Sequence, residues 1–407
     1  MTETASTTTT RPPLAFSPYD YAIHEDPYPT YERLRDEAPL YYNPDLDFWA
    51  LSRHVDVMAG FRDAERLSSA NGVSLDPAAY GPHAHKTMSF LALDDPRHQR
   101  MRRLVSKGFT PRRVQELSGR ILELTRQHLE PALAQGEFDF IEEVAGKLPM
   151  DVISELMGVP EADRAELRRL ADLVMHREEG VQDVPVPAME ASLHLVGYYA
   201  DMLAERRTKR TDDLTSALLD AELDGDRLTD DEIIGFMFLM VVAGNETTTK
   251  LLGNALSWGF RNPDELAKPF ADPARVPEWT EETLRYDTSS QMLARTAKVD
   301  LTYYGQTVPA GAQVLLLVGS ANRDSTVFAD ADTFRIGRDH DNNLVSFGGG
   351  THFCLGAHMA RLEANIALTE LVRRVESFEV DEASARRVHS SNVRGFATLP
   401  VRVTVRA

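Results

Sequence analysis

Cys354 is the only cysteine in the chain, and it follows a run of three glycines by a few residues. A lone cysteine is most often a small buried apolar residue. Here, however, residues 344–347 are typical of a short apolar strand and residues 357–374 of an amphipathic helix, so we expect Cys354 where a glycine-rich loop enters a helix. Free N–H groups and the helix dipole favour a thiolate at that point. One thiolate facing something flat suits the axial ligand of a haem iron, whereas zinc needs several Cys or His ligands and a disulfide needs a second cysteine.

A second group of reactive side chains interrupts a long apolar segment. Thr229 and Glu232 form a capping-box pattern before an apolar run that continues to Phe260. In the middle of this predicted helix, residues 243–249 read Ala-Gly-Asn-Glu-Thr-Thr-Thr, which includes several poor helix formers. Their hydroxyl groups can bind backbone carbonyls, bend the helix and admit water. Without Cys354, this pattern would favour a helix that crosses a wet interface.

Two pairs of charged residues have spacings that place them on one helix face. Glu282 and Arg285 are three residues apart, which by itself predicts only a weak surface ion pair. His98 and Arg102 are four residues apart and could bind one anion together. Taken alone, each of these side chains is more often solvated than bound to a ligand.

Residues 347–356 resemble the haem-binding loop of the cytochrome P-450 family, whose pattern is Phe-x-x-Gly-x-x-x-Cys-x-Gly. Phe347, Gly350, Cys354 and Gly356 match every fixed position. The resemblance implies that Cys354 ligates the iron of haem b and that Phe347 contacts the haem. In order and length of its elements, the chain is similar to the family from residue 20 to its end.

The interrupted helix also resembles a family motif, the oxygen-binding kink (Ala or Gly)-Gly-x-(Asp or Glu)-Thr, at residues 243–247. On that match Thr247 would hydrogen-bond the dioxygen that haem binds. Glu246 would relay protons from solvent, and Ala243 would contact the haem.

Glu282 and Arg285 match the Glu-x-x-Arg pair of the family, which implies a buried structural pair near the haem. The family usually completes this network from a Pro-x-Arg-Phe stretch. Here residues 331–334 read Ala-Asp-Thr-Phe and lack both Pro and Arg. Arg335, Arg338 or a backbone group are therefore the candidates for the missing contact.

The remaining site residues also rest on family positions. His98, Arg102, Arg295 and His352 match the usual contacts of the haem propionates. The stretches that enclose substrate in the family are apolar here, which predicts an apolar substrate pocket. Its expected members are Phe90, Leu91, Met175, Val242, Met292 and Phe396.

The charge balance limits the partners that the chain could bind. The formal net charge is −19, from 63 acidic and 44 basic residues, which opposes binding to nucleic acid or an anionic membrane. The sequence has no flavin or nicotinamide fingerprint, so electrons from NAD(P)H should arrive through a ferredoxin reductase and a ferredoxin. A basic cluster could be the docking patch for an acidic ferredoxin, or it could be ordinary solvated charge. Its members are Arg97, Arg100, Arg102, Arg103, Lys107, Arg112, Arg113 and Arg361.

The elements that must position these residues are mostly helices. Strand patterns occur within residues 40–53, 301–304, 313–318 and 400–405, and residues 71–90 read as a long irregular loop. We therefore expect a mainly α fold with small β-sheets, which by resemblance is the cytochrome P-450 fold with haem between the long central helix and the helix after the cysteine.

Composition suggests one large unit. Residues 1–15 are expected to be a disordered tail and residues 16–407 a single catalytic domain. The longest apolar run, residues 235–244, is shorter than the roughly 18 residues that span a bilayer, and the start lacks a signal-peptide pattern. With one cysteine, a reducing cytoplasm is the expected compartment, as in bacterial members of the family.

The resemblance thus implies a haem-thiolate monooxygenase that inserts one atom of O2 into an apolar small molecule, such as a polyketide of secondary metabolism. Alternatives are a peroxide-driven or C–C or C–O coupling haem-thiolate enzyme, and a non-catalytic haem sensor. The polar interruption of the long helix weighs against a sensor. Glu246 and Thr247 together favour the dioxygen route.

Overall fold

The computed structural model describes residues 12–106, 109, 111–179, 181–223, 225–340 and 342–406, without the side chains of residues 111–113. Its α-helices are α1 (Tyr21–Glu25), α2 (Tyr28–Glu37), α3 (His54–Arg62), α4 (His85–Met88), α5 (Arg97–Ser106), α6 (Pro111–Glu116), α7 (Ser118–Gln135), α8 (Lys147–Met157), α9 (Glu161–Met175), α10 (Val186–Thr208), α11 (Leu214–Asp220), α12 (Asp230–Arg261), α13 (Pro263–Ala271), α14 (Val276–Tyr286), α15 (Val318–Ala321) and α16 (Ala357–Arg374). Short 3-10 or π turns are η1 (Pro77–Ala79), η2 (Ser89–Ala92), η3 (Ile141–Ala145), η4 (Pro273–Arg275) and η5 (Gly350–His352).

The strands form one five-stranded sheet and several smaller sheets. The larger sheet has the order β1 (Leu40–Asn43), β2 (Phe48–Leu51), β10 (Gln313–Leu316), β7 (Leu293–Ala297) and β3 (Leu67–Ser68), and only the pairing of β2 with β10 is parallel. A second sheet has the order β11 (Val375–Val380), β14 (Pro400–Val405) and β4 (Glu137–Asp139). Three two-stranded sheets pair β5 (Glu222–Leu223) with β6 (Asp226–Arg227), β8 (Leu301–Tyr303) with β9 (Gln306–Val308), and β12 (Arg386–Arg387) with β13 (Phe396–Thr398).

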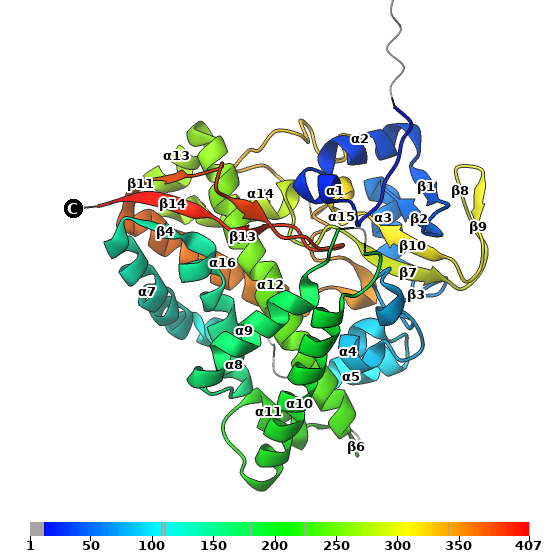
Figure 1. Cartoon of the computed structure of the whole chain (residues 1–407), viewed down its shortest axis with the longest axis horizontal. Helices are drawn as coiled ribbons and strands as arrows, with labels where there is room; N and C mark the ends of the chain where they lie inside the picture. Colours follow the sequence, from blue (N-terminus) through cyan, green and yellow to red (C-terminus); the bar gives the residue numbers. More distant parts are fainter. Residues whose placement is uncertain are drawn as a thin grey trace, which may run out of the picture.

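Helix α12 passes through the centre of the molecule (Figure 1). The blue and yellow elements of the larger sheet lie on one side of it, and the teal α7 and orange α16 lie on the other (Figure 1). The helix packs against α8, α9, α10, α14 and α16, which explains why it is apolar on most of its circumference. Its capping box is present, since the Thr229 hydroxyl accepts from the N–H of Glu232 and the Glu232 carboxylate accepts from the N–H of Thr229.

The mainly helical fold with small sheets is confirmed, and α16 spans the expected residues 357–374. The strand expected at residues 344–347 is wrong. Instead of pairing with a strand, the N–H of Val345 donates to the side-chain oxygen Oδ1 of Asn322, and the Ser346 hydroxyl donates to the backbone carbonyl of Leu284. The supposedly irregular loop at residues 71–90 contains the short helix α4 and the turn η1.

Residues 1–11 of the expected tail lie outside the described residues, and residues 12–15 have no regular structure. The single domain over residues 16–407 stays a prediction. Among the helices in the described part of the chain, none combines the length and apolar character that crossing a membrane requires.

Candidate functional site

A large cavity lies between α12 and the loop that carries Cys354. It contains about 1540 Å³ of space free of protein atoms, counting its open mouth, and its lining is predominantly apolar. Ala243 and Thr247 of α12 line it from one side, and Phe347, Cys354 and Glu363 line it from the other. The thiol of Cys354 is exposed on this wall. A cavity therefore lies between the long central helix and the cysteine loop, where the resemblance places haem.

Glycines allow the loop before Cys354 to turn tightly against α3. Gly350 has a positive φ of 63°, and a Cβ added there would lie 2.5 Å from the carbonyl oxygen of Phe61. The N–H of Cys354 donates to the Phe347 carbonyl at 3.0 Å, which closes the loop. Only glycine satisfies both the backbone angle and the close approach at residue 350.

The protonation of Cys354 differs from the expectation. Although the thiol is accessible from the cavity, it lies deep among protein atoms, and this loss of hydration raises its pKa above the ordinary value. The N–H groups of Gly356 and Ala357 and the guanidinium groups of Arg102 and Arg361 act in the opposite direction. The helix start thus favours the thiolate but does not suffice to form it. A metal ion at the sulfur would deprotonate the thiol outright.

Four basic side chains from three distant segments gather beside the cavity. His98 and Arg102 come from α5, Arg295 from β7 and His352 from η5. The ring centroids of His98 and His352 are 4.0 Å apart, and Arg102 Nη2 donates to the Phe353 carbonyl at 2.6 Å. Arg295 and His352 line the cavity itself. The structure therefore brings together all four residues that the sequence assigned to the propionates.

These four groups have almost no anionic partner within the described chain. Burial and the neighbouring cations lower the pKa of His352 to about 3, and burial lowers that of Arg295 to about 10. His98 contacts Asp95 at 3.3 Å, but no carboxylate of the described residues forms an ion pair with the other three. His98 Nε2, Arg102 Nη1 and His352 Nδ1 are buried without a hydrogen-bond partner. Buried polar groups are normally satisfied, so this cluster fits the carboxylates of a bound ligand.

The two expected catalytic residues of α12, Thr247 and Glu246, line different pockets. Thr247 lines the cavity, and its hydroxyl donates to the Ala243 carbonyl at 2.7 Å. Glu246 does not line the cavity. Its buried carboxylate lies in a second pocket and contacts Lys250 Nζ at 3.2 Å and the carboxyl group of Asp172. The sequence analysis missed both partners, although the i, i+4 spacing of Glu246 and Lys250 was a usable signal.

A further carboxyl group that the sequence analysis missed lies on α16. Glu363 is buried and lines the cavity on the side of Cys354, and burial raises its pKa to about 8. Its Oε2 atom has no hydrogen-bond partner among the described residues. A carboxyl group in such surroundings is held in its neutral form.

The predicted substrate pocket is only partly present. Phe90 and Leu91 line the cavity. Among the described residues that line the cavity, the other four predicted pocket residues do not occur. Val242, on α12, packs in the apolar core around that helix. Phe396 packs beside Gly253, and Met292 lies in the core around Tyr31. Met175 lines the second pocket.

Glu282 and Arg285 form a fully buried ion pair rather than a surface pair. Arg285 donates to both carboxylate oxygens of Glu282, at 2.8 and 2.9 Å. Its remaining N–H groups donate to the carbonyls of Asn322, Ala331 and Thr333. All five donors of the guanidinium are thereby used, which fixes the loop after α15 against α14.

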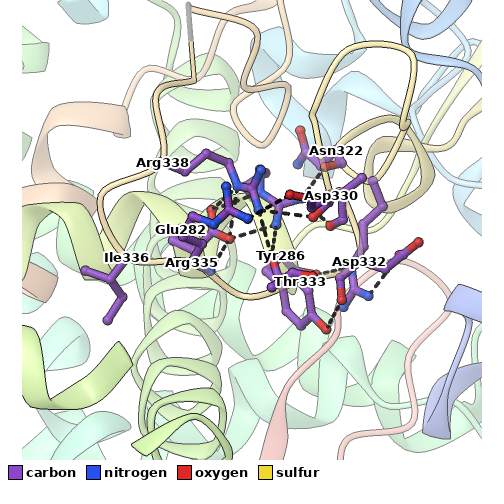
Figure 2. A network of polar contacts seen from close by, with 12 residues as sticks. Glu282, Tyr286, Asn322, Asp330, Asp332, Thr333, Arg335, Ile336 and Arg338 are labelled. Atoms are coloured by element: carbon purple, nitrogen blue, oxygen red, sulfur yellow. Dashed lines mark hydrogen bonds and ion pairs between the residues drawn. The ribbon is translucent and has the colours of Figure 1, made fainter. Parts of the chain in front are cut away.

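Two groups take the place of the missing Pro-x-Arg-Phe arginine. The N–H of Arg335 donates to Glu282 Oε1 at 2.8 Å, and the Arg338 guanidinium lies 3.3 Å from Glu282 Oε2 (Figure 2). The side chain of Arg335 points elsewhere and pairs with Asp330. A backbone group and an arginine four residues after Phe334 therefore complete the network.

Two members of the basic cluster near the cysteine loop are neutralised by ion pairs in the described part of the chain. Arg100 pairs with Asp226 and Glu232, and Arg361 pairs with Glu281. Arg97 and Arg103 are exposed. Lys107 and the side chains of Arg112 and Arg113 lie outside the described residues.

Comparison with known proteins gives concordant matches. Residues 277–406 match the family model described as cytochrome P-450. A putative cytochrome P-450 123 of Mycobacterium tuberculosis is 62% identical over 97% of this chain and 98% of its own length. The chain is also similar to the solved structure of the Bacillus subtilis cytochrome P-450 PksS of the bacillaene polyketide synthase, with a TM-score of 0.86, 32% identity, and coverage of 96% of this chain and 100% of that one. CYP109E1 of Bacillus megaterium, solved in complex with testosterone, matches with a TM-score of 0.81 and 31% identity over 93% of this chain and 99% of that one.

Proposed function

This chain belongs to the cytochrome P-450 family of monooxygenases, and from that premise we propose that it inserts one atom of O2 into an apolar small molecule. The observation that carries the proposal is the pairing, across one cavity, of the exposed Cys354 thiol with the Thr247 side of α12. Reduced nicotinamide would supply the electrons through separate proteins, in the cytoplasm.

The residues present fit haem. Cys354 would hold the iron. The two propionates would be bound by His98, Arg102, Arg295 and His352, because the propionates would supply the hydrogen-bond acceptors that these four side chains lack. Haem, when bound, supplies dioxygen activation, and a thiolate ligand favours O–O cleavage. The apolar walls, including Phe90 and Leu91, would exclude water and hold an apolar substrate.

The substrate class is proposed from the apolar lining and from two similar structures. One belongs to a polyketide synthase system, and the other was solved with testosterone. We propose a polycyclic or polyketide-like natural product of secondary metabolism. Polyketides and steroids would be screened for a shift of the Soret band, and a library of both classes that produces no shift would contradict this substrate class.

The Thr247→Ala variant should bind haem and substrate nearly as well as the wild type but should waste electrons. The hydroxyl is held at the cavity wall by its bond to the Ala243 carbonyl, so its oxygen can accept a hydrogen bond and order the protons delivered there. Without it, reduced dioxygen should leave as hydrogen peroxide. The measurement is the ratio of product to reduced nicotinamide consumed, with peroxide assayed in parallel.

Thr249→Ala is the matched control, because the Thr249 hydroxyl donates to the Ala145 carbonyl and does not line the cavity. It should leave the coupling ratio unchanged. A Thr247→Ala ratio equal to that of the wild type would show that Thr247 is only structural.

Charge reversal of Arg112 and Arg113 to Glu should slow reduction by an acidic ferredoxin at low salt, with normal haem content. The deficit should shrink as salt rises, because ions screen the attraction in the wild type. The control is the same reversal at Arg33 and Arg66, which pair with Glu37 and Asp63 outside the basic cluster. Equal reduction rates for the two double variants would show that the basic cluster is only solvated charge.

A further inference from the structure

The second pocket lies beside α12, apart from the large cavity. It contains about 1060 Å³ of space free of protein atoms, counting its open mouth. Its wall is formed mainly by residues of η3, α9, α12 and the C-terminal segment 387–397, and none of its described residues also lines the large cavity. A molecule in this pocket would therefore contact a separate set of side chains from a substrate in the large cavity.

One charged side chain of this wall, Arg387, is buried and incompletely satisfied. It is 8% exposed, and its Nη1 atom has no hydrogen-bond partner among the described residues. The guanidinium group stacks on Phe396, with 4.3 Å between its Cζ atom and the ring centroid. This contact holds the group in place but accepts none of its hydrogen bonds. Because a buried charged donor without an acceptor costs free energy, a ligand that supplies an acceptor would be favoured here.

A neighbouring carboxylate, Asp287, compensates Arg387 only in part. Its Oδ2 atom lies 3.7 Å from Arg387 Nη1, which is too long for a hydrogen bond. Asp287 already accepts from three closer donors, which are the Arg394 guanidinium and the Tyr28 hydroxyl, each at 2.7 Å, and the Trp258 indole at 2.8 Å. Two arginines thus share one carboxylate. Burial and the charge of Arg394 lower the pKa of Arg387 to about 10, so the guanidinium keeps its positive charge at neutral pH.

The other arginine and lysine side chains of the described wall already have carboxylate partners. The pairs are Arg168 with Glu142, Arg169 with Glu166, and Lys250 with Glu246. Arg387 therefore stands apart, because the carboxylate beside it is bound more closely by another arginine. The pocket has one positive charge to offer to a ligand.

The rest of the wall limits the ligand to a singly charged anion with an apolar body. Glu142, Asp172 and Glu246 place carboxyl groups around the same space, and these would repel a doubly charged group such as a phosphate ester. A single carboxylate can accept two N–H groups of one guanidinium. An apolar body would cover the apolar side chains of the wall, which are Ile141, Leu173, Met175, Val388, Val393 and Ala397.

We propose that this pocket is a second ligand site, which binds a monocarboxylic acid with an apolar body through Arg387. Since no described residue lines both spaces, such an acid and a substrate in the large cavity can bind at the same time. The site does not rest on the proposed function, because the acid is held by Arg387 and the apolar wall rather than by haem or its ligand.

The test measures the binding of decanoate to the purified holoenzyme by isothermal titration calorimetry. Decanol and decyl phosphate are the comparison probes, because they keep the alkyl chain and change only the head group. The Soret band is recorded for each addition, since a shift would report a ligand in the large cavity beside haem.

Arg387→Met removes the charge and keeps an unbranched side chain over Phe396. Arg386→Met is the matched control, because Arg386 is the preceding residue, is exposed and does not line the pocket in the described structure. The wild type should bind decanoate more tightly than decanol or decyl phosphate, without a Soret shift. Arg387→Met should weaken decanoate binding by roughly ten- to a hundredfold, the range for a hydrogen bond to a charged group, and leave decanol binding unchanged. Arg386→Met should match the wild type for all three probes.

Ala397→Phe tests the same pocket without changing its charge. Ala397 lines the pocket at an exposed position of β13, so a larger side chain there would fill the space without entering the core. This variant should lose the binding of decanoate and decanol alike. It also decides the question if Arg387→Met does not fold, because unchanged decanoate binding in Ala397→Phe would overturn the proposal.

Equal decanoate affinities of the wild type and Arg387→Met would overturn the proposal, and so would equal affinities of the wild type for decanoate and decanol. Tighter binding of decyl phosphate would show that the anion class is wrong. Decanoate binding that always shifts the Soret band and is unaffected by Arg387→Met would place the acid in the large cavity instead. Failure of the proposed function would look different, since the wild type would then bind decanoate but oxygenate no substrate.

Discussion

A Cys354→Ser variant should lose the absorption of the reduced carbonyl adduct that marks thiolate ligation, and its oxygenation activity should fall below detection. Serine has nearly the same volume and leaves the loop bond from residue 354 to Phe347 in place. A hydroxyl group remains protonated where burial already raises the pKa of the thiol, so it is a far weaker metal ligand. The measurement is the difference spectrum of the reduced protein with and without carbon monoxide.

A measurement of haem content distinguishes loss of the thiolate ligand from loss of haem itself. Apolar contacts and the four basic residues near the propionate position should retain part of the haem in Cys354→Ser, which a haem extraction assay would show. If the reduced carbon monoxide adduct of active wild-type protein has the spectrum of a histidine-ligated haem, the proposed ligation by the Cys354 thiolate is wrong.

A Glu282→Ala variant should lose a large part of the stability of the fold. The change leaves Arg285 and Arg338 charged, buried and without their carboxylate, because both side chains are almost fully covered. Breaking a buried ion pair in this way costs about 3–5 kcal/mol, a large part of the roughly 5–15 kcal/mol that stabilises a typical protein. The measurement is urea unfolding followed by circular dichroism, with haem content as a second readout.

Glu281→Ala is a stringent control, since it removes the neighbouring carboxylate of a partly exposed pair with Arg361. Its effect should stay within about 1 kcal/mol. If Glu282→Ala cannot be purified, Glu282→Gln keeps the hydrogen-bond geometry and should show an intermediate loss. A stability of Glu282→Ala equal to that of Glu281→Ala would show that the network in Figure 2 adds no stability.

Features set by neighbouring residues could be predicted from the sequence. The capping box at Thr229 and Glu232, the bounds of α16 and the tight loop before Cys354 depend on contacts within a few residues. The alternating pattern of β14 also covers the expected residues 400–405, although the strands that pair with it, β11 and β4, are distant in sequence. Local backbone preferences and side-chain periodicity favour such elements, so they can be read without knowledge of distant partners.

The tertiary structure decided the features that depend on distant partners. Val345 satisfies its N–H with a side chain, so the apolar run at residues 344–347 does not pair as a strand. Met292 and Phe396 are apolar enough to face a substrate, but both side chains are packed in the hydrophobic core. Periodicity predicts which side of an element is apolar, but it does not predict what covers that side.

The contrast is clearest at the candidate site. The motifs named the candidate residues, including Cys354 and Glu246, but several of the groups that surround them come from far along the chain. Glu246 meets Asp172 of α9 in a pocket away from Thr247, and Arg338 replaces an arginine that the sequence lacks. The sequence by itself determined the reactive groups and the helices that carry them. Only the packing of α9, α12 and the loop after α15 decided their charges and contacts, because burial and partner distance set the free energy of a charged group.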